Sequence, residues 1–306
     1  MKTRLIALTL CVGLSISVSS AEDTYKVVDE TGKHLDVVTP AGKTVLRYVY
    51  VRDRSTKATT FDTAKVFAHV FADDGKTTLT KGPGGKFPHH RGIFIGWSKL
   101  KQGGKSHDLW HVRNTEQLHN SFMSTEADNK GATITAQIDW IGVDGDVVIK
   151  EQRTYQVVDS NDAHAVIDFT SEMKAVNGEV ELNGDPEHAG IQFRPSQKVA
   201  DNKSAKYLFH EEGIDPTKQK DLPWVAESFQ IDDSWWTVQH MSHPENPKGA
   251  RWSAYRDYGR FGPFTVVKID DGDSVTFKYR FVILKGNDAS RDGLTKRYSQ
   301  YSSRKN

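Results

Sequence analysis

The chain has 306 residues, and its 41 Lys and Arg residues nearly balance 40 Asp and Glu residues. A near-neutral chain with interspersed charges argues against nucleic acid or an anionic membrane surface as a partner. The chain has one cysteine, Cys11, which excludes a fold stapled by disulfides within the chain.

The first 21 residues have the pattern of a secretory signal peptide. Lys2 and Arg4 precede an apolar run, and the small residues Ser19 and Ala21 stand where a signal peptidase cleaves. That run is too short for a membrane span, and no later segment approaches the required length. We therefore predict a periplasmic or secreted protein that leaves the membrane after signal removal, with residues 22–306 as a single domain.

Most of the remaining chain has the alternation of apolar and polar residues that is typical of half-buried strands. The runs are rich in Val, Ile, Thr, Phe and Tyr and are separated by turn sequences such as Asp144-Gly145. We predict strands over residues 44–51, 64–72, 132–141, 146–158, 164–176, 263–270 and 274–284. A helix is predicted only near the end, from a cap at Asp288 or Ser290 to Tyr301. The predicted fold class is all-β, a large antiparallel β-sandwich with a short C-terminal helix, whose loops carry the chemistry.

The first candidate site segment is GPGGKFPHHRGIFIGW, residues 82–97. It places His89, His90 and Arg91 side by side ahead of a predicted strand. Because side chains alternate in an extended segment, we predict that His89 faces away from the site as a structural residue. His90 and Arg91 are predicted to face a pocket. The alternative is a hydrated turn without a function.

The second and third segments combine histidine with acids and an aromatic ring. SHDLWHV, residues 106–112, offers Trp110 for stacking on a sugar ring and His111 for proton transfer, although a core tryptophan flanked by solvated charges explains the pattern equally well. GDPEHAGIQFRP, residues 184–195, predicts one strand face that carries an imidazole, an amide and a guanidinium. The residues of that face are His188, Gly190, Gln192 and Arg194, with Asp185 and Glu187 close by.

The fourth and fifth segments add more histidines and arginines. WWTVQHMSHPENPKG, residues 235–249, holds His240 and His243 at a spacing that can chelate a metal, followed by Asn246. RWSAYRDYGRFGPF, residues 251–264, interleaves arginines such as Arg256 with aromatic residues such as Tyr258. This pattern suits a carboxylate or sugar pocket, or a cation–π surface that only stabilises the fold.

Several common catalytic signatures are absent from the sequence. His210-Glu211 begins like a metalloprotease helix, but Ile214 stands where the second histidine belongs. No nucleophile elbow occurs outside the signal peptide, and the chain has no phosphate-binding loop, dinucleotide fingerprint or cysteine cluster. What remains is acid–base or metal chemistry by histidine, tyrosine, arginine and carboxylate side chains.

The order of these segments carries a resemblance to a known family. FPHHRGIFIGW, DLWH, DPEHAGIQFRPS, HPENP and RWSAYRDYGRFG together resemble the PmoA-like family of exported bacterial proteins over most of the mature chain. The resemblance implies an all-β fold similar to the galactose mutarotase-type sandwich, and a role in carbohydrate metabolism. The family label alludes to a membrane subunit of methane monooxygenase, but no segment here is apolar enough to span a bilayer, so neither copper nor methane is inferred.

The leading hypothesis is a carbohydrate-active enzyme, a hydrolase, lyase or epimerase that acts on a saccharide. Its predicted acid–base groups are His90, His111, His188, Tyr258 and Glu187. Its predicted substrate-binding groups are Arg91, Trp110, Gln192, Arg194, His243, Asn246 and Arg256.

Two alternatives remain open. In the first, one divalent metal is held by imidazoles, and carboxylates such as Asp108 or Glu187 offset the nearby arginines. The histidines for that site are His89 or His90, His111, His188, and His240 or His243. In the second, the protein is a non-catalytic carbohydrate-binding module. Its stacking platforms are Trp97, Trp110, Trp235, Trp236 and Trp252.

Overall fold

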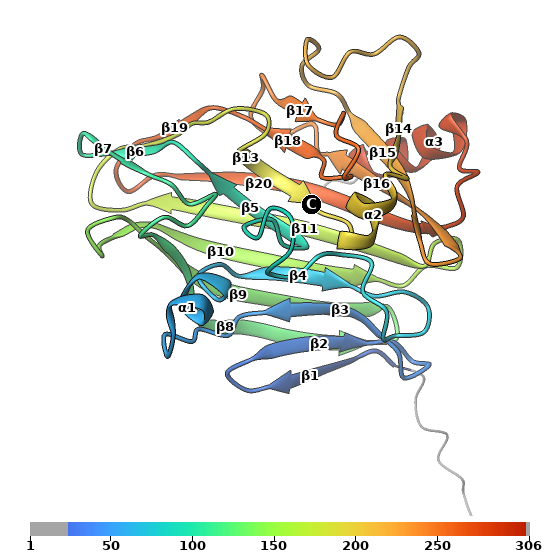
Figure 1. The fold of residues 1–306 in the computed structure, drawn as a ribbon, viewed down its shortest axis with the longest axis horizontal. Coiled ribbons are helices and arrows are strands. Elements are labelled where there is room, and N and C mark those ends of the chain that lie inside the picture. Colours follow the sequence, from blue (N-terminus) through green and yellow to red (C-terminus); the bar gives the residue numbers. More distant parts are fainter. Residues whose placement is uncertain (1–23, 304–306) are drawn as a thin grey trace, which may run out of the picture.

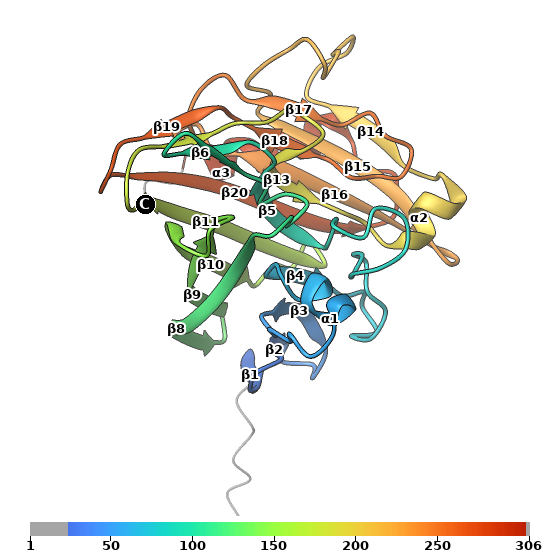
Figure 2. The ribbon, with the colours of Figure 1, turned by 60° about the vertical axis from the view of Figure 1, so that its left-hand side comes forward.

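The computed structural model describes residues 24–303, so the expected signal peptide lies outside the described residues. Two large sheets, in which every recorded strand pairing is antiparallel, pack face to face (Figure 1). Figure 2 separates the two layers, with β1–β4 on one side and β8–β10 on the other. One apolar core lies between them and includes Tyr48 of the first sheet and Tyr155 of the second, whose ring centroids are 5.9 Å apart. The predicted all-β sandwich is confirmed.

The first sheet has six strands and carries the loops of the candidate site. Its strands, in spatial order, are β1 (Lys26–Glu30), β2 (His34–Val38), β3 (Thr44–Val49), β4 (Phe67–Val70), β5 (Ile93–Trp97) and β13 (Ala189–Phe193). The second sheet has eight strands and forms the opposite layer. Its strands, in spatial order, are β14 (Lys206–Phe209), β15 (Trp224–Ile231), β16 (Ser234–Ser242), β20 (Ser274–Lys285), β11 (Ala165–Ala175), β10 (Val147–Val158), β9 (Gly131–Ile141) and β8 (Glu116–Asp128).

Two small sheets and three helices complete the described fold. The small sheets contain β19 (Val267–Ile269), β12 (Val180–Leu182), β6 (Leu100–Gln102) and β7 (Lys105–His107), and the pair β17 (Arg251–Ser253) and β18 (Gly262–Phe264). The helices are α1 (Lys57–Asp62), α2 (Gln197–Asn202) and α3 (Arg291–Ser302). Helix α3 begins after the cap residue Ser290, whose hydroxyl accepts the N–H of Gly293, as predicted.

The predicted strands are present, but residues 263–270 divide into β18 and β19. The longest strand, β8, was not predicted. Its pairing with β9 shifts register between His119 and Ser121 and again between Phe122 and Ser124, so its apolar residues do not alternate regularly. The helices α1 and α2 are each six residues long and too short to give a periodic signal.

A pair of glycines brings distant loops together on the first sheet. Gly96 of β5 is the register partner of Gly190 of β13. A Cβ atom on Gly96 would lie 2.6 Å from the carbonyl oxygen of Leu109, so the absent side chain lets residues 109 and 110 lie directly against β5. The loop before β5, the segment around residue 110 and the segment before β13 therefore meet on one face.

Candidate functional site

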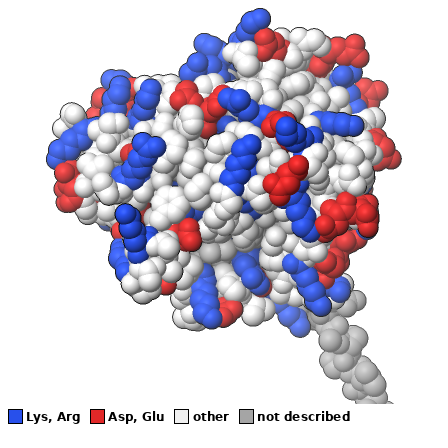
Figure 3. All heavy atoms as spheres, in the orientation of Figure 1, with Lys and Arg blue, Asp and Glu red and all other residues white. Residues whose placement is uncertain are grey.

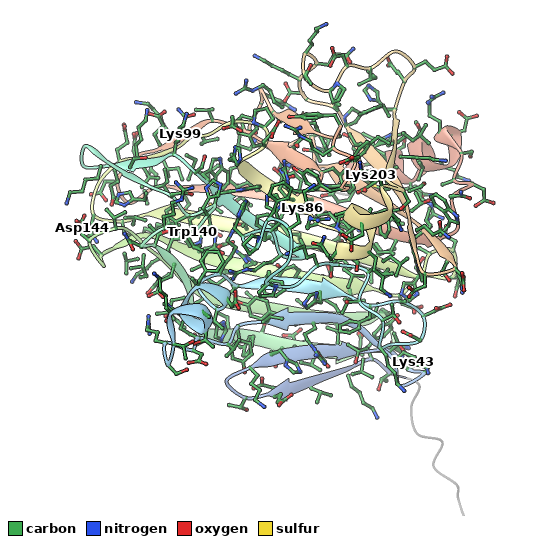
Figure 4. All side chains as sticks on the ribbon, in the orientation of Figure 1. Lys43, Lys86, Lys99, Trp140, Asp144 and Lys203 are labelled. Carbon is green, nitrogen blue, oxygen red and sulfur yellow. The ribbon has the colours of Figure 1, made fainter. Side chains whose placement is uncertain are left out.

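Three half-buried histidines from these three segments form a row, which we call the histidine row. The ring centroids of His89 and His111 are 4.4 Å apart, and those of His111 and His188 are 5.2 Å apart. In Figure 4, Lys86 marks the loop that carries His89, near the middle of the drawn face. Residues nearly 100 positions apart in the chain are thus brought within contact distance.

Two members of the row are each paired with an aspartate. Nδ1 of His111 lies 2.9 Å from Oδ2 of Asp108, and Nδ1 of His188 lies 2.9 Å from Oδ1 of Asp185. Because a carboxylate accepts hydrogen bonds, each Nδ1 carries the proton and leaves Nε2 as the free nitrogen. Although burial acts to raise it, the pKa of Asp108 is lowered overall by hydrogen bonds from His111, so Asp108 stays ionised. We call these two pairs the Asp–His dyads.

The loop of the first dyad is held in a strained conformation. Oδ1 of Asp108 accepts the backbone N–H groups of Trp110 and His111, at 3.2 and 2.9 Å. The next residue, Val112, has a φ of 53°, a left-handed conformation that is a genuine outlier for a β-branched residue. Such strain costs about 1–3 kcal/mol and clusters at functional sites. The backbone conformation at Val112 therefore lowers the stability of the folded protein, and the same loop places the His111 side chain in the histidine row.

An ion pair forms the rim beside His188. Arg256 donates a short hydrogen bond to Oε1 of Glu187, and the hydroxyl of Tyr255 donates to the same oxygen at 3.0 Å. Burial acts to raise the pKa of Glu187, but these two donors lower it below its usual value. Glu187 therefore stays ionised, so of the two acid–base roles predicted for it, the donation of a proton is disfavoured. Tyr255, 37% exposed, is an aromatic ring at the rim that the sequence reasoning did not select.

His90 and Tyr258 lie beneath the row and not in it. The ring centroid of His90 lies 4.3 Å from that of His89, and the ring also contacts those of Phe87, Trp110 and Tyr258, but it is only 3% exposed. Burial holds the pKa of His90 well below its usual value, with Arg260 adding to the effect, so the ring is neutral. The predicted orientation of this segment is wrong: His89 joins the row, because residues 87–90 form a turn and do not alternate like a strand.

Arg91 points away from the row. Its NH2 group donates to the backbone oxygen of Phe61 at 2.7 Å, and its guanidinium lies 5.4 Å from the Phe61 ring centroid. Both contacts are with the last turn of α1. The prediction that Arg91 faces the same pocket as His90 is wrong, and the residue anchors α1 to the sheet instead.

A buried polar layer supports the row from below. Gln192 and Arg194 are fully buried, so the predicted shared face with the half-exposed His188 is wrong. The physical reasons are that His188 belongs to the turn before β13, where its N–H donates to the backbone oxygen of Asp185, and that Gly190 has a left-handed φ of 82°. Oε1 of Gln192 accepts a hydrogen bond from Arg260 at 2.9 Å, and the Arg260 guanidinium lies 5.5 Å from the Trp110 ring centroid. These side chains position the floor of the site and do not reach solvent.

Lys65 connects two of the loops from within. Its amine is buried and donates to the backbone oxygens of Trp110 and His89, at 2.5 and 3.3 Å. It also lies 4.5 Å from the Phe94 ring centroid. Burial lowers its pKa well below the usual value, and the nearby Arg91 lowers it further. Sequence reasoning missed Lys65, because a single lysine at the start of a predicted strand carries no signal.

The two residues predicted from the HPENP segment lie elsewhere. The His243 ring packs on Tyr301 of α3, and Asn246 is tied to the backbone of Lys278 by two hydrogen bonds of 2.7 Å. His240 is fully buried among aromatic rings such as Trp252 and Phe281. Their predicted roles in substrate or metal binding are therefore wrong. All three residues belong to the packing around the second sheet.

Most of the predicted sugar platforms are buried, and the predicted metal ligands are not brought together. Four of the five tryptophans are at most 2% exposed and cannot stack on a ligand at the surface, namely Trp97, Trp110, Trp236 and Trp252. Within residues 24–303, no group of three or more His, Cys, Asp or Glu side chains is placed to hold a metal ion.

A signal in the sequence could have found the dyads. DLWH and DPEH share one spacing, an aspartate three residues before a histidine, and both turns place the carboxylate against Nδ1. The repeated spacing is visible without any structure.

A buried carboxyl group below Arg194 gives a prediction about stability. Glu227 is fully buried, its two oxygens have no hydrogen-bond partner among the described residues, and burial raises its pKa well above the usual value in spite of Arg194. Above the unfolded pKa of about 4.5, the unfolded chain loses this proton while the folded protein keeps it. The free energy of unfolding therefore falls as pH rises from about 4.5 toward the raised folded pKa, by up to about 1.4 kcal/mol per pH unit. We expect Glu227→Gln to match the wild type near pH 4 and to exceed its stability increasingly at higher pH, in urea unfolding.

The control for this experiment is Glu126→Gln, which alters an exposed carboxylate on β8. It should leave the pH dependence of unfolding as in the wild type. A constant difference between Glu227→Gln and the wild type from pH 4 to pH 8 would show that Glu227 is ionised in the folded state.

Comparison with known proteins places the chain in a family. No helix within the described residues is long and apolar enough to cross a membrane. A search of curated proteins gives no match. The model of a family of unknown function, DUF6807, matches residues 37–299, a range that contains the whole histidine row and both dyads. Because the match covers most of its length, the chain belongs to this family of unknown function.

Proposed function

We propose that the protein is an exported carbohydrate-active enzyme that transfers protons at a carbon atom of a saccharide, as a lyase or an epimerase. The observation that carries the proposal is the pair of Asp–His dyads, with imidazole rings 5.2 Å apart. An imidazole oriented by a carboxylate is a common general base, and a second one beside it can return the proton.

The surroundings of the dyads support the proton-transfer chemistry. The side chains of His111 and His188 are 20% and 38% exposed, so both rings are partly open to a ligand. Burial first, and then the charges of nearby groups including Lys65 and Arg260, lower the pKa of the neighbouring His89 to about 2. Burial disfavours a charge of either sign, but a nearby cation such as Arg260 stabilises the negative charge that forms when a C–H bond loses its proton.

Hydrolysis by a pair of carboxyl groups fits the site less well. That reaction needs one carboxylic acid with a raised pKa and a second carboxylate close to the scissile bond. The pKa values of Asp108 and Glu187 are instead lowered by their hydrogen-bond donors, and Asp185 is engaged by His188. Of the three reaction types considered, we therefore retain lyase and epimerase.

The saccharide substrate, the export and the narrower family assignment are parts of the same proposal. The signal-like pattern of residues 1–21 supports export, and the motifs FPHHRGIFIGW and DPEHAGIQFRPS support membership of the PmoA-like family. Both motifs contribute to the histidine row, the first with His89 and the second with His188. The rim aromatic Tyr255 offers a face on which a sugar can stack.

The proposal is tested by incubating the purified protein in D2O with a panel of uronic-acid and neutral oligosaccharides. An epimerase would place deuterium on a ring carbon, visible by NMR, and a lyase would create a double bond that absorbs in the ultraviolet. Release of reducing ends without either signal would indicate hydrolysis. Binding without any change in the saccharide would contradict an enzymatic function.

A further inference from the structure

A groove of about 660 Å³ opens beside the histidine row. It runs between α1 and the turn that joins β9 to β10, with His111 in its wall and Asp144 near the left-hand edge in Figure 4. The volume lies within the range of about 300–1,000 Å³ typical of ligand pockets. We call it the basic groove, for the residues named next.

The groove has a local surplus of positive charge. Four cations line it, namely Arg52, Arg54, Lys57 and Arg113, against the two acids Glu116 and Asp144. Glu116 is shared between Arg52 and Arg54, at 2.5 and 2.6 Å, and Asp144 is paired with Lys105 at 2.7 Å. Elsewhere on the face drawn in Figure 3, basic and acidic side chains are intermingled. The surplus of positive charge is therefore local to the groove, because the chain as a whole is nearly neutral.

Lys57, the lysine of this groove, does not stabilise helix α1. Lys57 is exposed and occupies the first turn of α1, which has no acidic residue. A positive charge in the first turn of a helix is unfavourable, and no ion pair of Lys57 is recorded among residues 24–303. Its substitution should leave the fold intact, which makes it a clean probe of the groove.

The groove is connected to the first dyad. Nε of Arg113 lies 3.7 Å from Oδ2 of Asp108, the oxygen that is paired with His111. The strained residue Val112 and the left-handed Asn114 also line the groove. One distorted loop thus presents His111 on the row and a cation in the groove.

We propose that the basic groove binds the carboxylate groups of an acidic saccharide and leads one of its sugar residues to His111. This inference rests on the proposed function and names its substrate class. Proton removal from a sugar carbon is easiest next to a carboxylate, and bound cations offset the charge that develops there. A carboxylated sugar therefore offers a carboxylate to the cations of the groove and an acidic C–H bond to the dyads.

The experiment measures binding by calorimetry, with His188→Gln as the background so that turnover does not interfere. The probes are an oligogalacturonate, a neutral gluco-oligosaccharide of equal length and a sulfated galactan oligosaccharide without carboxylates. We expect the oligogalacturonate to bind best and to weaken as salt is added. Lys57→Gln should weaken it about twofold to fivefold and Lys57→Gln/Arg54→Gln further, because an exposed ion pair contributes about 0.4–1 kcal/mol.

The matched control is Lys43→Gln, an exposed lysine that Figure 4 shows at the opposite lower corner from Asp144. It should not change the affinity. Equal binding of neutral and acidic probes, or equal loss with Lys43→Gln and Lys57→Gln, would overturn the groove proposal, and so would preference for the sulfated probe over the carboxylated one. Tight, Lys57-dependent oligogalacturonate binding without turnover by the wild type would uphold the groove and refute the enzymatic function instead.

Discussion

His111→Gln is expected to lower kcat on the responsive saccharide by about 10²–10⁴-fold, the usual contribution of a positioned acid or base. Glutamine keeps a similar size and polarity but cannot take up the proton. Asp108 remains anchored in this variant, because its Oδ1 still accepts the backbone N–H groups of residues 110 and 111. The loss should therefore appear in kcat with the free energy of unfolding nearly unchanged. His188→Gln should lose activity in the same range.

A histidine outside the site provides the control for this substitution. His34 of β2 also lies beside a carboxylate, with Nε2 at 3.3 Å from Oε2 of Glu30. His34→Gln should keep full activity. The positioning role of the aspartate is tested by Asp108→Asn, which retains the backbone contacts and removes the negative charge. We expect kcat to fall while KM stays. Turnover by His111→Gln within twofold of the wild type would refute the dyad mechanism.

Gly190→Ala is expected to destabilise the protein by about 2–5 kcal/mol. The φ of 82° strains any residue with a Cβ atom, and that atom would lie 2.1 Å from the carbonyl oxygen of Pro263 and 2.6 Å from Cα of Phe264. Left-handed strain accounts for about 1–2 kcal/mol and overpacking against backbone for about 1–3 kcal/mol. Urea unfolding monitored by tryptophan fluorescence measures the difference.

Gly104→Ala separates the two contributions. Gly104 has a similar φ of 77°, but nothing lies within 4 Å of its Cβ position. This variant should lose only the cost of strain. If the two variants were equally stable, the close approach between β13 and β18 would carry no energetic weight.

The sequence predicted the sandwich well because period-two alternation reports directly which face of a strand is buried. The predicted strands at residues 146–158 and 164–176 became β10 and β11, which have strongly alternating burial. The prediction failed at β8, where two register shifts interrupt the alternation. It also failed for α1 and α2, which are too short for a helical period to emerge.

The candidate site was predicted in part, and the errors about which side chains face it share one cause. Extended geometry was assumed for the residues around His90 and around Gly190, but the first segment is a turn and the second contains a left-handed residue. Each departure changes which neighbour faces the site, so His89 joined the row while Arg91 turned toward α1. Motif content selected three segments that the fold brings together. Side-chain direction depends on backbone angles that composition does not reveal.

The buried amine of Lys65 affects how the site can move. Since it donates to the carbonyl of His89 on one loop and that of Trp110 on another, neither loop can swing outward alone without leaving a buried donor or acceptor unmatched. Lys65 therefore restrains the loops of His89 and His111 together, and moving either loop alone breaks one of its hydrogen bonds. A ligand of this site therefore meets two histidine loops that are already joined to each other before it binds.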